Sequence, residues 1–243
     1  MTEGVRRVGL ITGASRGVGA SVATMLADRG FNVVINYHSK RSRAEEVAAD
    51  VQARGARALI VQADLTKSDE TSAMVSTIGK TFGRLDALVL NASGGLEKGK
   101  PPEYAMDLNL TAQIGLVDAS LPLIPRGGRI VFITSHMAHF YAERGMVGPY
   151  QPVAASKYAG EQALRARQTE FADRGIALAI VSGDMIEGTI TPRLLERMDR
   201  GTINARLEQV GSLPTVAEFA FAIAEAVTTA LPSGHTIFVG STD

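Results

Sequence analysis

The sequence of 243 residues contains no cysteine, no excess of either charge and no long apolar run. Without cysteine the chain forms no disulfide, no thiolate metal site and no cysteine nucleophile.

The charges balance, because lysine plus arginine and aspartate plus glutamate both total 25. Because nucleic-acid binders usually carry a basic excess, we expect no nucleic-acid partner. No apolar run approaches the roughly 18 residues of a membrane helix, and residues 1–7 contain no apolar signal segment, so we expect a cytoplasmic protein with no membrane partner.

The composition and the order of expected elements indicate an α/β fold. Apolar residues make up 45% and charged residues 21%, which excludes a disordered or fibrous chain. Short aliphatic runs alternate with segments of helical period. The expected strands cover residues 8–12, 32–37, 58–62, 87–90, 129–134, 177–181 and 235–239, and the expected helices cover residues 18–29, 41–54, 67–82, 102–121, 152–174 and 215–229. This alternation predicts a doubly wound, Rossmann-like, seven-stranded parallel sheet with helices on both faces.

One segment, residues 184–209, interrupts the alternation between the sixth strand and the last helix. It contains a short helical piece around residues 191–200, which is typical of an insertion that covers a substrate. Asp184 and Glu187 are either loop caps or substrate contacts. Elsewhere there is no linker, internal repeat or low-complexity tract, so we expect residues 1–243 to fold as a single domain.

The first expected strand leads directly into a glycine-rich turn and a helix. Gly13, Gly17 and Gly19 follow Thr12 with the spacing Gly-x-x-x-Gly-x-Gly. Glycines permit a tight turn and close backbone approach, while the following helix points unpaired N–H groups and the positive end of its dipole at the turn. A glycine turn without a ligand is the alternative. The position in the first β–α turn of an alternating chain favours a pyrophosphate site.

From this turn onward the sequence resembles the short-chain dehydrogenase/reductase family, over essentially the whole chain. Besides the turn, the resemblance rests on Ala63-Asp64-Leu65, Leu90-Asn91-Ala92-Ser93-Gly94, Asn109 and Ser135. It implies a dinucleotide-binding oxidoreductase domain over residues 1–243. The residues that it assigns to the cofactor are Gly13, Ser15, Arg16, Gly17, Val18, Gly19, Asn36, His38, Ser39, Lys40, Asp64, Leu65, Asn91, Ala92, Ser93, Lys157, Gly183 and Ile186.

The end of the second expected strand indicates which nicotinamide nucleotide is bound. In dinucleotide folds an acid at this position binds the ribose 2′-hydroxyl and excludes a 2′-phosphate. Here no acid occurs until Glu45. The donors available to a phosphate are Arg16, Ser39, Lys40 and Arg41. The alternative is that residues 40–43 are a solvated helix start, but cations there oppose the helix dipole, so we expect NADP(H).

The catalytic residues depart from the family pattern at one position. Similar proteins carry a tyrosine four residues before a lysine, whose charge lowers the pKa of the phenol. The lysine candidate is Lys157, but Val153 occupies the tyrosine position. Tyr150 gives the wider spacing Tyr-(x)6-Lys, which resembles the enoyl-thioester reductases of the family, and Pro152 predicts that Tyr150 lies just before the helix. The catalytic set that the resemblance implies is Asn109, Ser135, Tyr150 and Lys157.

The segment of residues 136–149 is longer than its counterpart in similar proteins, and we expect it to form a loop that positions Tyr150. Within it, His136, His139 and Tyr141 are alternative proton donors. The pair His136-x-x-His139 lacks a third ligand, so we expect no metal.

Three functions remain open from the sequence. The leading one is NADPH-dependent reduction of a carbonyl on an apolar or acyl-thioester substrate. The nearest alternative is an NADPH-dependent enoyl-thioester (enoyl-acyl-carrier-protein) reductase, and a further alternative is an NADP(H)-binding protein without turnover, because Val153 replaces the usual tyrosine. The partners we expect are a small-molecule or carrier-linked substrate and further copies of the chain in a homo-dimer or homo-tetramer.

Overall fold

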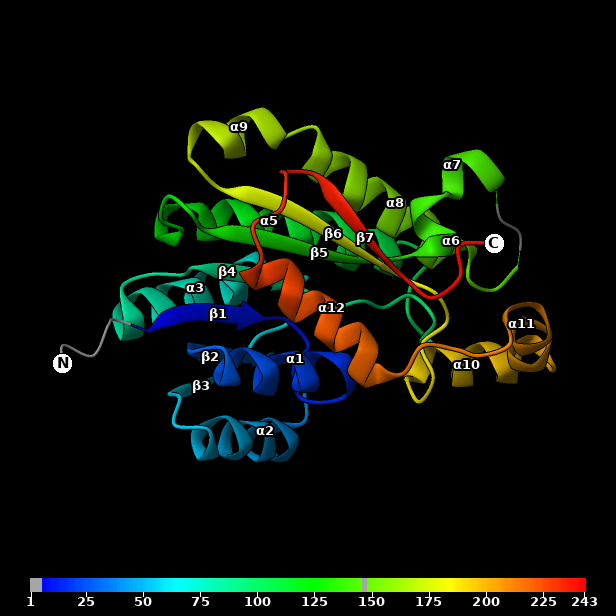
Figure 1. Ribbon diagram of the computed structural model, residues 1–243, viewed down its shortest axis with the longest axis horizontal. Helices are drawn as coiled ribbons and strands as arrows, with labels where there is room; N and C mark the ends of the chain where they lie inside the picture. The colour runs from blue at the N-terminus through cyan, green and yellow to red at the C-terminus, as the bar shows by residue number, and fades with distance from the viewer. Residues whose placement is uncertain (1–5, 146–147) are drawn as a thin grey trace.

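The computed structural model describes residues 6–145 and 148–243. The prediction that residues 1–7 contain no signal segment falls mostly on residues 1–5, which lie outside the described residues. Residues 146 and 147 of the expected loop also lie outside them. Within the described chain, seven parallel strands form one sheet in the order β3-β2-β1-β4-β5-β6-β7 (Figure 1). Their bounds are β1 Arg7–Ile11, β2 Phe31–Tyr37, β3 Ala58–Gln62, β4 Ala87–Leu90, β5 Arg129–Ser135, β6 Ala177–Gly183 and β7 His235–Val239. The predicted doubly wound sheet is confirmed.

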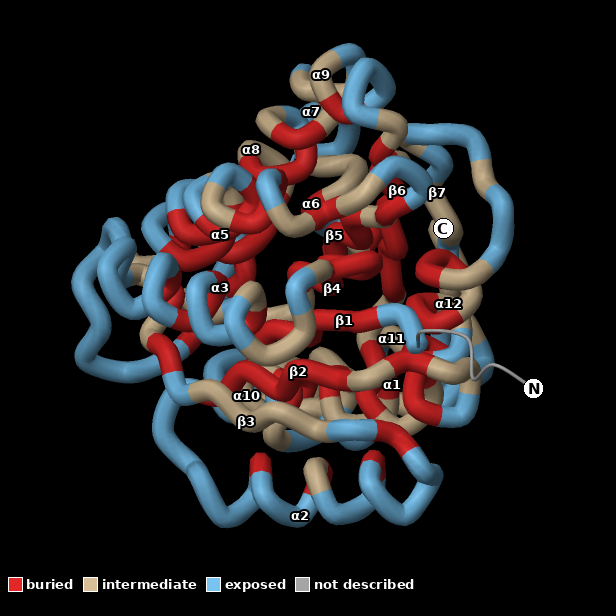
Figure 2. The backbone as a smooth tube through the Cα atoms, turned by 90° about the vertical axis from the view of Figure 1, so that its left-hand side faces the viewer, coloured by how far each residue is buried: buried red, intermediate tan, exposed pale blue. Residues whose placement is uncertain are grey.

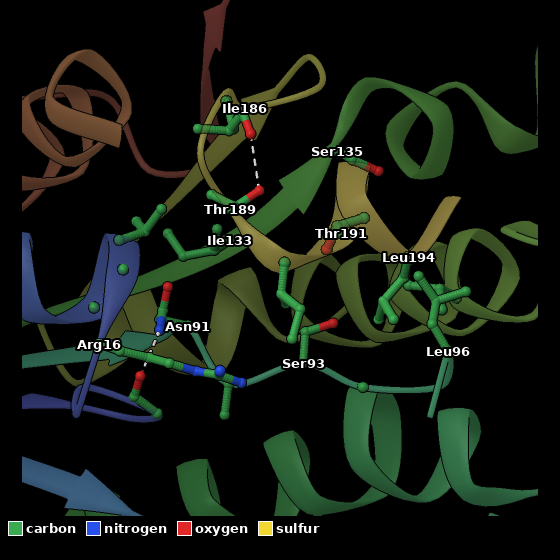
Figure 3. Close-up of a pocket in the computed structure, with 18 of the residues that line it drawn as sticks. Arg16, Asn91, Ser93, Leu96, Ile133, Ser135, Ile186, Thr189, Thr191 and Leu194 are labelled. Atoms are coloured by element: carbon green, nitrogen blue, oxygen red, sulfur yellow. Dashed lines mark hydrogen bonds between the residues drawn. The ribbon is translucent and has the colours of Figure 1, made fainter. Parts of the chain in front are cut away.

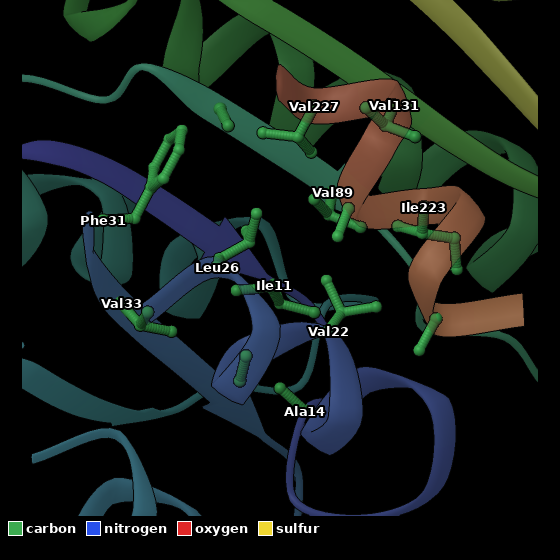
Figure 4. Close-up of a cluster of buried hydrophobic side chains, with 14 of the residues drawn as sticks. Ile11, Ala14, Val22, Leu26, Phe31, Val33, Val89, Val131, Ile223 and Val227 are labelled. Atoms are coloured by element: carbon green, nitrogen blue, oxygen red, sulfur yellow. The ribbon is translucent and has the colours of Figure 1, made fainter. Parts of the chain in front are cut away.

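Helices cover both faces of the sheet because its central strands carry apolar side chains on both sides. One face packs against α1 (Gly17–Asp28), α2 (Arg41–Ala53) and α12 (Val216–Thr228), and the other against α3 (Ser68–Phe82), α5 (Ala112–Ser120) and α8 (Gln151–Arg165). In β1, Ile11 points to the first face and Leu10 to the second. Figure 4 shows Ile11 against Val22 of α1, with Ile223 of α12 beside them. Figure 2 shows the buried strands enclosed by helices whose outer surfaces are exposed.

The strand order reverses between β1 and β4, which pair directly with each other. Chains leaving the carboxyl ends of these two strands diverge to opposite sides of the sheet and leave a crevice between them. The glycine-rich turn after β1 and the segment after β4 therefore face each other across this crevice.

The helix predicted over residues 102–121 is present, but it is not a uniform α-helix. It consists of α4 (Tyr104–Met106), a π-turn (Asp107–Thr111), α5 and a 3₁₀ turn (Leu121–Leu123). The π-turn contains Asn109, whose side chain bonds two other segments, Gly94 and Ser156. Such single π-turns inside helices occur mainly where a side chain has a functional or structural task.

The helix predicted over residues 152–174 is also interrupted. It divides into α8 and α9 (Gln168–Asp173). At the division the amide of Arg167 bonds the carbonyl of Leu164 in a tighter 3₁₀ pattern, and the Arg167 guanidinium pairs with Asp118 of α5 at 2.7 Å. This change of direction lets Phe171 of α9 reach full burial in the core.

Two segments hold more helix than the sequence indicates. The expected loop begins with α6 (His136–His139) and α7 (Tyr141–Arg144). The insertion at residues 184–209 contains α10 (Ile190–Met198), close to the predicted helical piece, and also α11 (Thr202–Val210). No helix in the described part of the chain combines the length and the apolar character needed to span a bilayer.

Candidate active site

A cavity of about 780 Å³ lies at the carboxyl ends of the strands (Figure 3). All of the residues that the sequence resemblance assigned to a cofactor line this cavity. Of the expected catalytic set, Ser135, Tyr150 and Lys157 line it, whereas Asn109 lies behind its wall. Figure 3 shows Arg16 at one end, Leu96 and Leu194 at the other, and Ser135 on the apolar side.

Thr12 ties together the two turns that frame the crevice. It is fully buried, and its hydroxyl oxygen accepts hydrogen bonds from the amides of Asn91 and Ala92, both at 2.9 Å. The Asn91 side chain adds a second link, because its Nδ2 donates to the Thr12 carbonyl at 2.8 Å. Sequence reasoning included Thr12 only as part of the glycine motif and missed this role, for which its place directly before Gly13 was the available signal.

The glycine-rich turn brings the start of α1 to the cavity. Gly13 and Gly17 have φ of 62° and 56°, which is the left-handed region that favours glycine. A Cβ at Gly19 would lie 2.7 Å from Asn91 Nδ2, so only glycine permits this close approach. At Gly17, by contrast, a Cβ would meet no protein atom within 4 Å. The unpaired amides of the first turn of α1 thus border open space, as an anion site requires.

Asn36, at the end of β2, holds the glycine turn to the neighbouring strand. Its side chain is buried, with Oδ1 accepting from the Gly13 amide at 3.2 Å and Nδ2 donating to the Ala63 carbonyl at 3.3 Å. Asn36 therefore lines the cavity, but its amide group is already engaged in fixing the cavity wall.

The segment after β2 supplies the cations at this end. Lys40 and Arg43 line the cavity, together with Arg16. Arg41, which the sequence suggested as a phosphate donor, is not part of the lining, and its Nε pairs with Glu45 at 2.8 Å. Because successive helical residues point about 100° apart, Arg43 rather than Arg41 faces the cavity.

Asp64 lies opposite these cations on the segment after β3. Partial burial acts to raise the pKa of Asp64, but hydrogen bonds from the hydroxyl and amide of Thr66 prevail and hold it below its usual value. His38 Nε2 lies 3.6 Å from the Asp64 carboxylate. The cavity lining at this end therefore contains a carboxylate acceptor, Asp64, as well as the cations.

Ser135 and Tyr150 meet at the centre of the cavity. Ser135 ends β5, and Tyr150 directly precedes α8, as Pro152 predicts. Tyr150 Oη donates a hydrogen bond to Ser135 Oγ at 3.1 Å. The Tyr150 side chain is buried, and burial raises the pKa of its phenol while the Ser135 hydrogen bond lowers it to a lesser extent. The wider tyrosine spacing thus still brings a phenol to the serine.

Lys157 lies on the buried face of α8. Its ammonium donates to the Ile133 carbonyl at 2.9 Å, and burial lowers the pKa of Lys157 to about 8. Ile133 stands two residues before Ser135 on β5, so the ammonium and the serine are held against the same strand end.

Asn109 supports the site from behind the cavity wall. Its Nδ2 donates to the Gly94 carbonyl at 2.8 Å and to Ser156 Oγ at 3.0 Å. Gln113, one turn later, donates to the Ala92 carbonyl at 3.1 Å. These two amides fix the segment after β4 to the helices beside it. Sequence reasoning missed Gln113, and its helical spacing from Asn109 was the only signal.

The end of the cavity beyond Tyr150 is apolar. Val153, which replaces the usual tyrosine, is buried in a cluster with Leu96 and Leu195, and the partly buried Leu194 packs against it. Leu194 and Leu195 come from α10, so this part of residues 184–209 borders the cavity.

Asp184 anchors this insertion to the rest of the chain. Its carboxylate forms a two-point ion pair with Arg206 of α11, at 2.9 and 2.8 Å. Arg206 also donates to the carbonyls of Ser241 and Asp243. Of the two roles left open by the sequence, this geometry favours a structural one for Asp184.

The alternative proton donors have other partners. His136 lines the cavity, but its Nδ1 lies 2.8 Å from Ser182 Oγ, and burial lowers its pKa. His139 pairs with Glu161 of α8, and Tyr141 packs against Tyr158. Within residues 6–145 and 148–243, no group of three or more histidine, aspartate or glutamate side chains is placed to hold a metal ion.

Comparisons with known proteins agree with this geometry. The family model described as short chain dehydrogenase matches residues 7–199. The 3-oxoacyl-[acyl-carrier-protein] reductase FabG of Staphylococcus aureus is 33% identical over 199 residues, covering 78% of each chain. A 1-cyclohexenylcarbonyl-CoA reductase of Streptomyces collinus is 33% identical over 190 residues, covering 75% of this chain and 65% of the relative.

Solved structures show the same architecture over nearly the full length. A short chain dehydrogenase from Burkholderia cenocepacia J2315 in complex with NADP superimposes with a TM-score of 0.82 at 27% identity, covering 97% of this chain and 96% of the other. A short-chain dehydrogenase/reductase from Serratia marcescens gives 0.83 at 25% identity, covering 97% of both chains. The chain therefore belongs to the short-chain dehydrogenase/reductase family, and it is an oxidoreductase of that type.

Proposed function

We propose that this chain binds NADP(H) and reduces a carbonyl group of an apolar or acyl-thioester substrate. One observation carries the proposal: the Tyr150 phenol lies 3.1 Å from Ser135 Oγ inside a cavity that Lys157 also lines. A phenol beside a hydroxyl and an ammonium is a proton donor for an oxygen that gains negative charge. The proposal treats residues 1–243 as one oxidoreductase domain in which residues 184–209 cover the substrate.

The cavity residues fit a nicotinamide dinucleotide. The open space at Gly17 borders the first turn of α1, where a pyrophosphate receives backbone N–H donors. Asp64 and Leu65 line the cavity where the adenine would lie, and Asn91 to Ser93 would flank the middle of the nucleotide. The Burkholderia cenocepacia structure of this fold contains NADP.

The charges at the end of β2 support NADP(H) over NAD(H). No acid follows β2 until Glu45, and that carboxylate pairs with Arg41. Arg16, Lys40 and Arg43 line the cavity at this end and would hold a 2′-phosphate by charge-assisted hydrogen bonds.

The residues around Tyr150 divide the chemistry of reduction between them. When bound, NADPH supplies a hydride to the carbonyl carbon. Tyr150 gives its proton to the carbonyl oxygen, so that an alcohol and a phenolate result. The Lys157 ammonium stabilises this phenolate, and Ser135 Oγ orients the oxygen through a hydrogen bond. Val153 and Leu96 exclude water from the apolar end, where the substrate chain would lie.

Enoyl-thioester reduction is the second candidate function. It is favoured by the spacing of Tyr150 and Lys157, which is the wider one. In that reaction the same phenol would protonate or polarise the enolate oxygen of the thioester. A third possibility, nucleotide binding without turnover, rests on Val153 at the usual tyrosine position.

The test is NADPH consumption with a 3-oxoacyl thioester, a 2-enoyl thioester and an apolar ketone, for the wild type, Tyr150→Phe and Tyr158→Phe. We expect turnover of a carbonyl substrate, and a kcat at least about 100-fold lower for Tyr150→Phe, because general acid catalysis is typically worth 10²–10⁴. Tyr158→Phe is the control: it removes the hydroxyl of a tyrosine in α8 that does not line the cavity, and it should leave kcat unchanged.

Each other outcome selects an alternative. Turnover of the enoyl thioester alone supports the second candidate, and tight NADPH binding without consumption supports the third. A loss of less than about tenfold in Tyr150→Phe contradicts the role of Tyr150. Assembly into a homo-dimer or homo-tetramer and a cytoplasmic location remain part of the proposal, and light scattering of the purified chain tests the assembly.

A further inference from the structure

The short helix α6 connects the proposed active site to a buried ionic network. Ser135 is the N-cap of α6, and its Oγ accepts a hydrogen bond from the amide of Ala138 at 3.2 Å. The same oxygen accepts the hydrogen bond of Tyr150. The position of the Ser135 hydroxyl is therefore tied to the position of α6.

Glu161 holds the other end of α6. Its side chain, on α8, is completely inaccessible to solvent. His139, the last residue of α6, places Nδ1 2.8 Å from Oε1 and 3.0 Å from Oε2 of this carboxylate. Arg165, one turn further along α8, donates to Oε1 at 2.9 Å. A buried carboxylate is stable only when it is paired and hydrogen-bonded in this way.

Arg165 extends the network to the edge of the sheet. Its two terminal nitrogens donate to the Gly234 carbonyl at 2.9 Å and to Thr236 Oγ1 at 2.7 Å. Glu161 thus joins α6 to α8 directly, and Arg165 joins them to the start of β7. Glu161 also lies one helical turn after Lys157, so the same stretch of α8 carries the proposed catalytic ammonium.

At its first residue, α6 is attached to β6. His136 Nδ1 lies 2.8 Å from Ser182 Oγ. The helix has only four residues and makes few internal hydrogen bonds, so its position depends on contacts with other segments. These are the polar contacts at its two ends and the packing of the fully buried Ala138 against Tyr150 and Val153.

We propose that His139, Glu161 and Arg165 form a positioning network that fixes α6 and thereby holds Ser135 Oγ in register with Tyr150 and Lys157. None of the three touches the proposed reacting atoms. They act through Ser135, and in this sense the inference rests on the proposed function.

The test compares two disrupting substitutions, His139→Leu and Glu161→Gln, with two control substitutions. His139→Leu removes the donor to Glu161, whereas His139→Asn keeps an N–H close to the position of Nδ1. Glu161→Gln removes the charge at the same size. As a control, Glu170→Gln on α9 breaks a partly buried ion pair with Arg167, the residue before that helix.

Two measurements are made on the full chain: hydrogen exchange of the Ala138 amide and kcat for NADPH-dependent reduction. We expect exchange at Ala138 to rise at least about tenfold in His139→Leu and Glu161→Gln, and kcat to fall about 10- to 100-fold, as misplacement of a positioning group predicts. His139→Asn should restore both values, and Glu170→Gln should change neither.

A double-mutant cycle with Ser135→Ala separates positioning from plain stability. If the network acts through Ser135, Glu161→Gln lowers kcat little further once Ser135 is alanine. Fully additive losses, or exchange that rises equally in α1 and α6, overturn the inference. If the wild type reduces no carbonyl, the proposed function fails, and exchange at Ala138 alone then decides whether the network holds Ser135.

Discussion

At the scale of single residues, burial acts in opposite directions on the two proposed proton-handling groups. It raises the pKa of the Tyr150 phenol and lowers the pKa of the Lys157 ammonium from its ordinary 10.5 to about 8. In both cases the low-dielectric surroundings disfavour the charged form. An ammonium with a lowered pKa is costly to keep in a folded chain at neutral pH, which is typical of a residue retained for chemistry.

The pKa of Lys157 gives a prediction for stability against pH. Between about pH 8 and 10.5 the unfolded chain keeps a proton on Lys157 that the folded chain has released. The free energy of unfolding therefore rises with pH in this window, by about 3 kcal/mol for a shift of this size. Lys157→Met lacks this contribution. The measurement is urea unfolding of both proteins at about pH 7 and about pH 10.5, without nucleotide.

Other groups also titrate in this range, so the difference between the two proteins is the quantity to compare. We expect the wild type to gain stability relative to Lys157→Met as pH rises. If the two curves run parallel, the ammonium is not held in the buried position that its hydrogen bond to Ile133 describes.

At the scale of the elements, the strands follow from the sequence and the connecting helices follow only partly. Each strand is built around a short apolar run that can be recognised locally, and its bounds were predicted to within about two residues. The α6 helix and the break between α8 and α9 depend instead on contacts such as His139 with Glu161 and Arg167 with Asp118. These partners are distant in sequence, and no local pattern indicates that they meet.

The same division applies to the site. The cofactor residues stand at strand ends and glycine turns, where the fold alone brings them together, and all of them line the cavity. Whether Arg41 or Arg43 points into the cavity depends on the exact rotation of the helix. The link that the Thr12 hydroxyl makes between two turns depends on the path of the backbone. Neither could be obtained from residue type and spacing.

The packing of α8 against the π-turn gives a prediction at this scale. A Cβ at Gly160 would overlap the carbonyl oxygen of Asn109. Gly160→Ala should therefore separate α8 from the π-turn and lower the free energy of unfolding by about 1–3 kcal/mol, as overpacking does. The hydrogen bonds of Asn109 should also weaken, and kcat should fall. Denaturant unfolding and NADPH consumption measure the two effects.

Gly115 of α5 provides the matched control. It is an exposed helical glycine whose added Cβ would meet no atom within 4 Å. Gly115→Ala should stabilise the chain by about 0.5–1 kcal/mol, because alanine is the better helix former. Equal effects of the two substitutions would contradict the close approach at Gly160.

At the scale of the whole molecule, the cavity joins the two halves of the sheet. Its residues come from β1 to β3 on one side of the strand reversal and from β4 to β6 on the other. A ligand that contacts both sides binds the folded chain but not the unfolded chain. At a free concentration [L] and with a dissociation constant Kd, it therefore raises the free energy of unfolding by RT ln(1 + [L]/Kd).

We expect NADPH at about 100 times its Kd to stabilise the chain by about 2.7 kcal/mol, which raises Tm by about 5–10 °C for a protein of this size. NADH at the same concentration should raise Tm less, because Arg16, Lys40 and Arg43 gain no phosphate. Differential scanning calorimetry measures both shifts.

Arg16→Ala tests the origin of this preference. If Arg16 binds the additional phosphate as proposed, the substitution should reduce the shift with NADPH and leave the shift with NADH unchanged. A loss of both shifts would assign Arg16 to the pyrophosphate and leave the choice of nucleotide unexplained.

The place of Tyr150 ahead of α8 has a consequence for how this enzyme can be altered. The proposed proton donor, Tyr150, lies directly before α8, whereas Lys157 is held within α8 by its hydrogen bond to Ile133. Changes within residues 141–149, which leave α6 and its contact with Glu161 in place, would move the acid relative to a substrate without altering the residues at the nucleotide end of the cavity. For laboratory evolution toward new ketones, this stretch is the natural place for insertions and randomised codons.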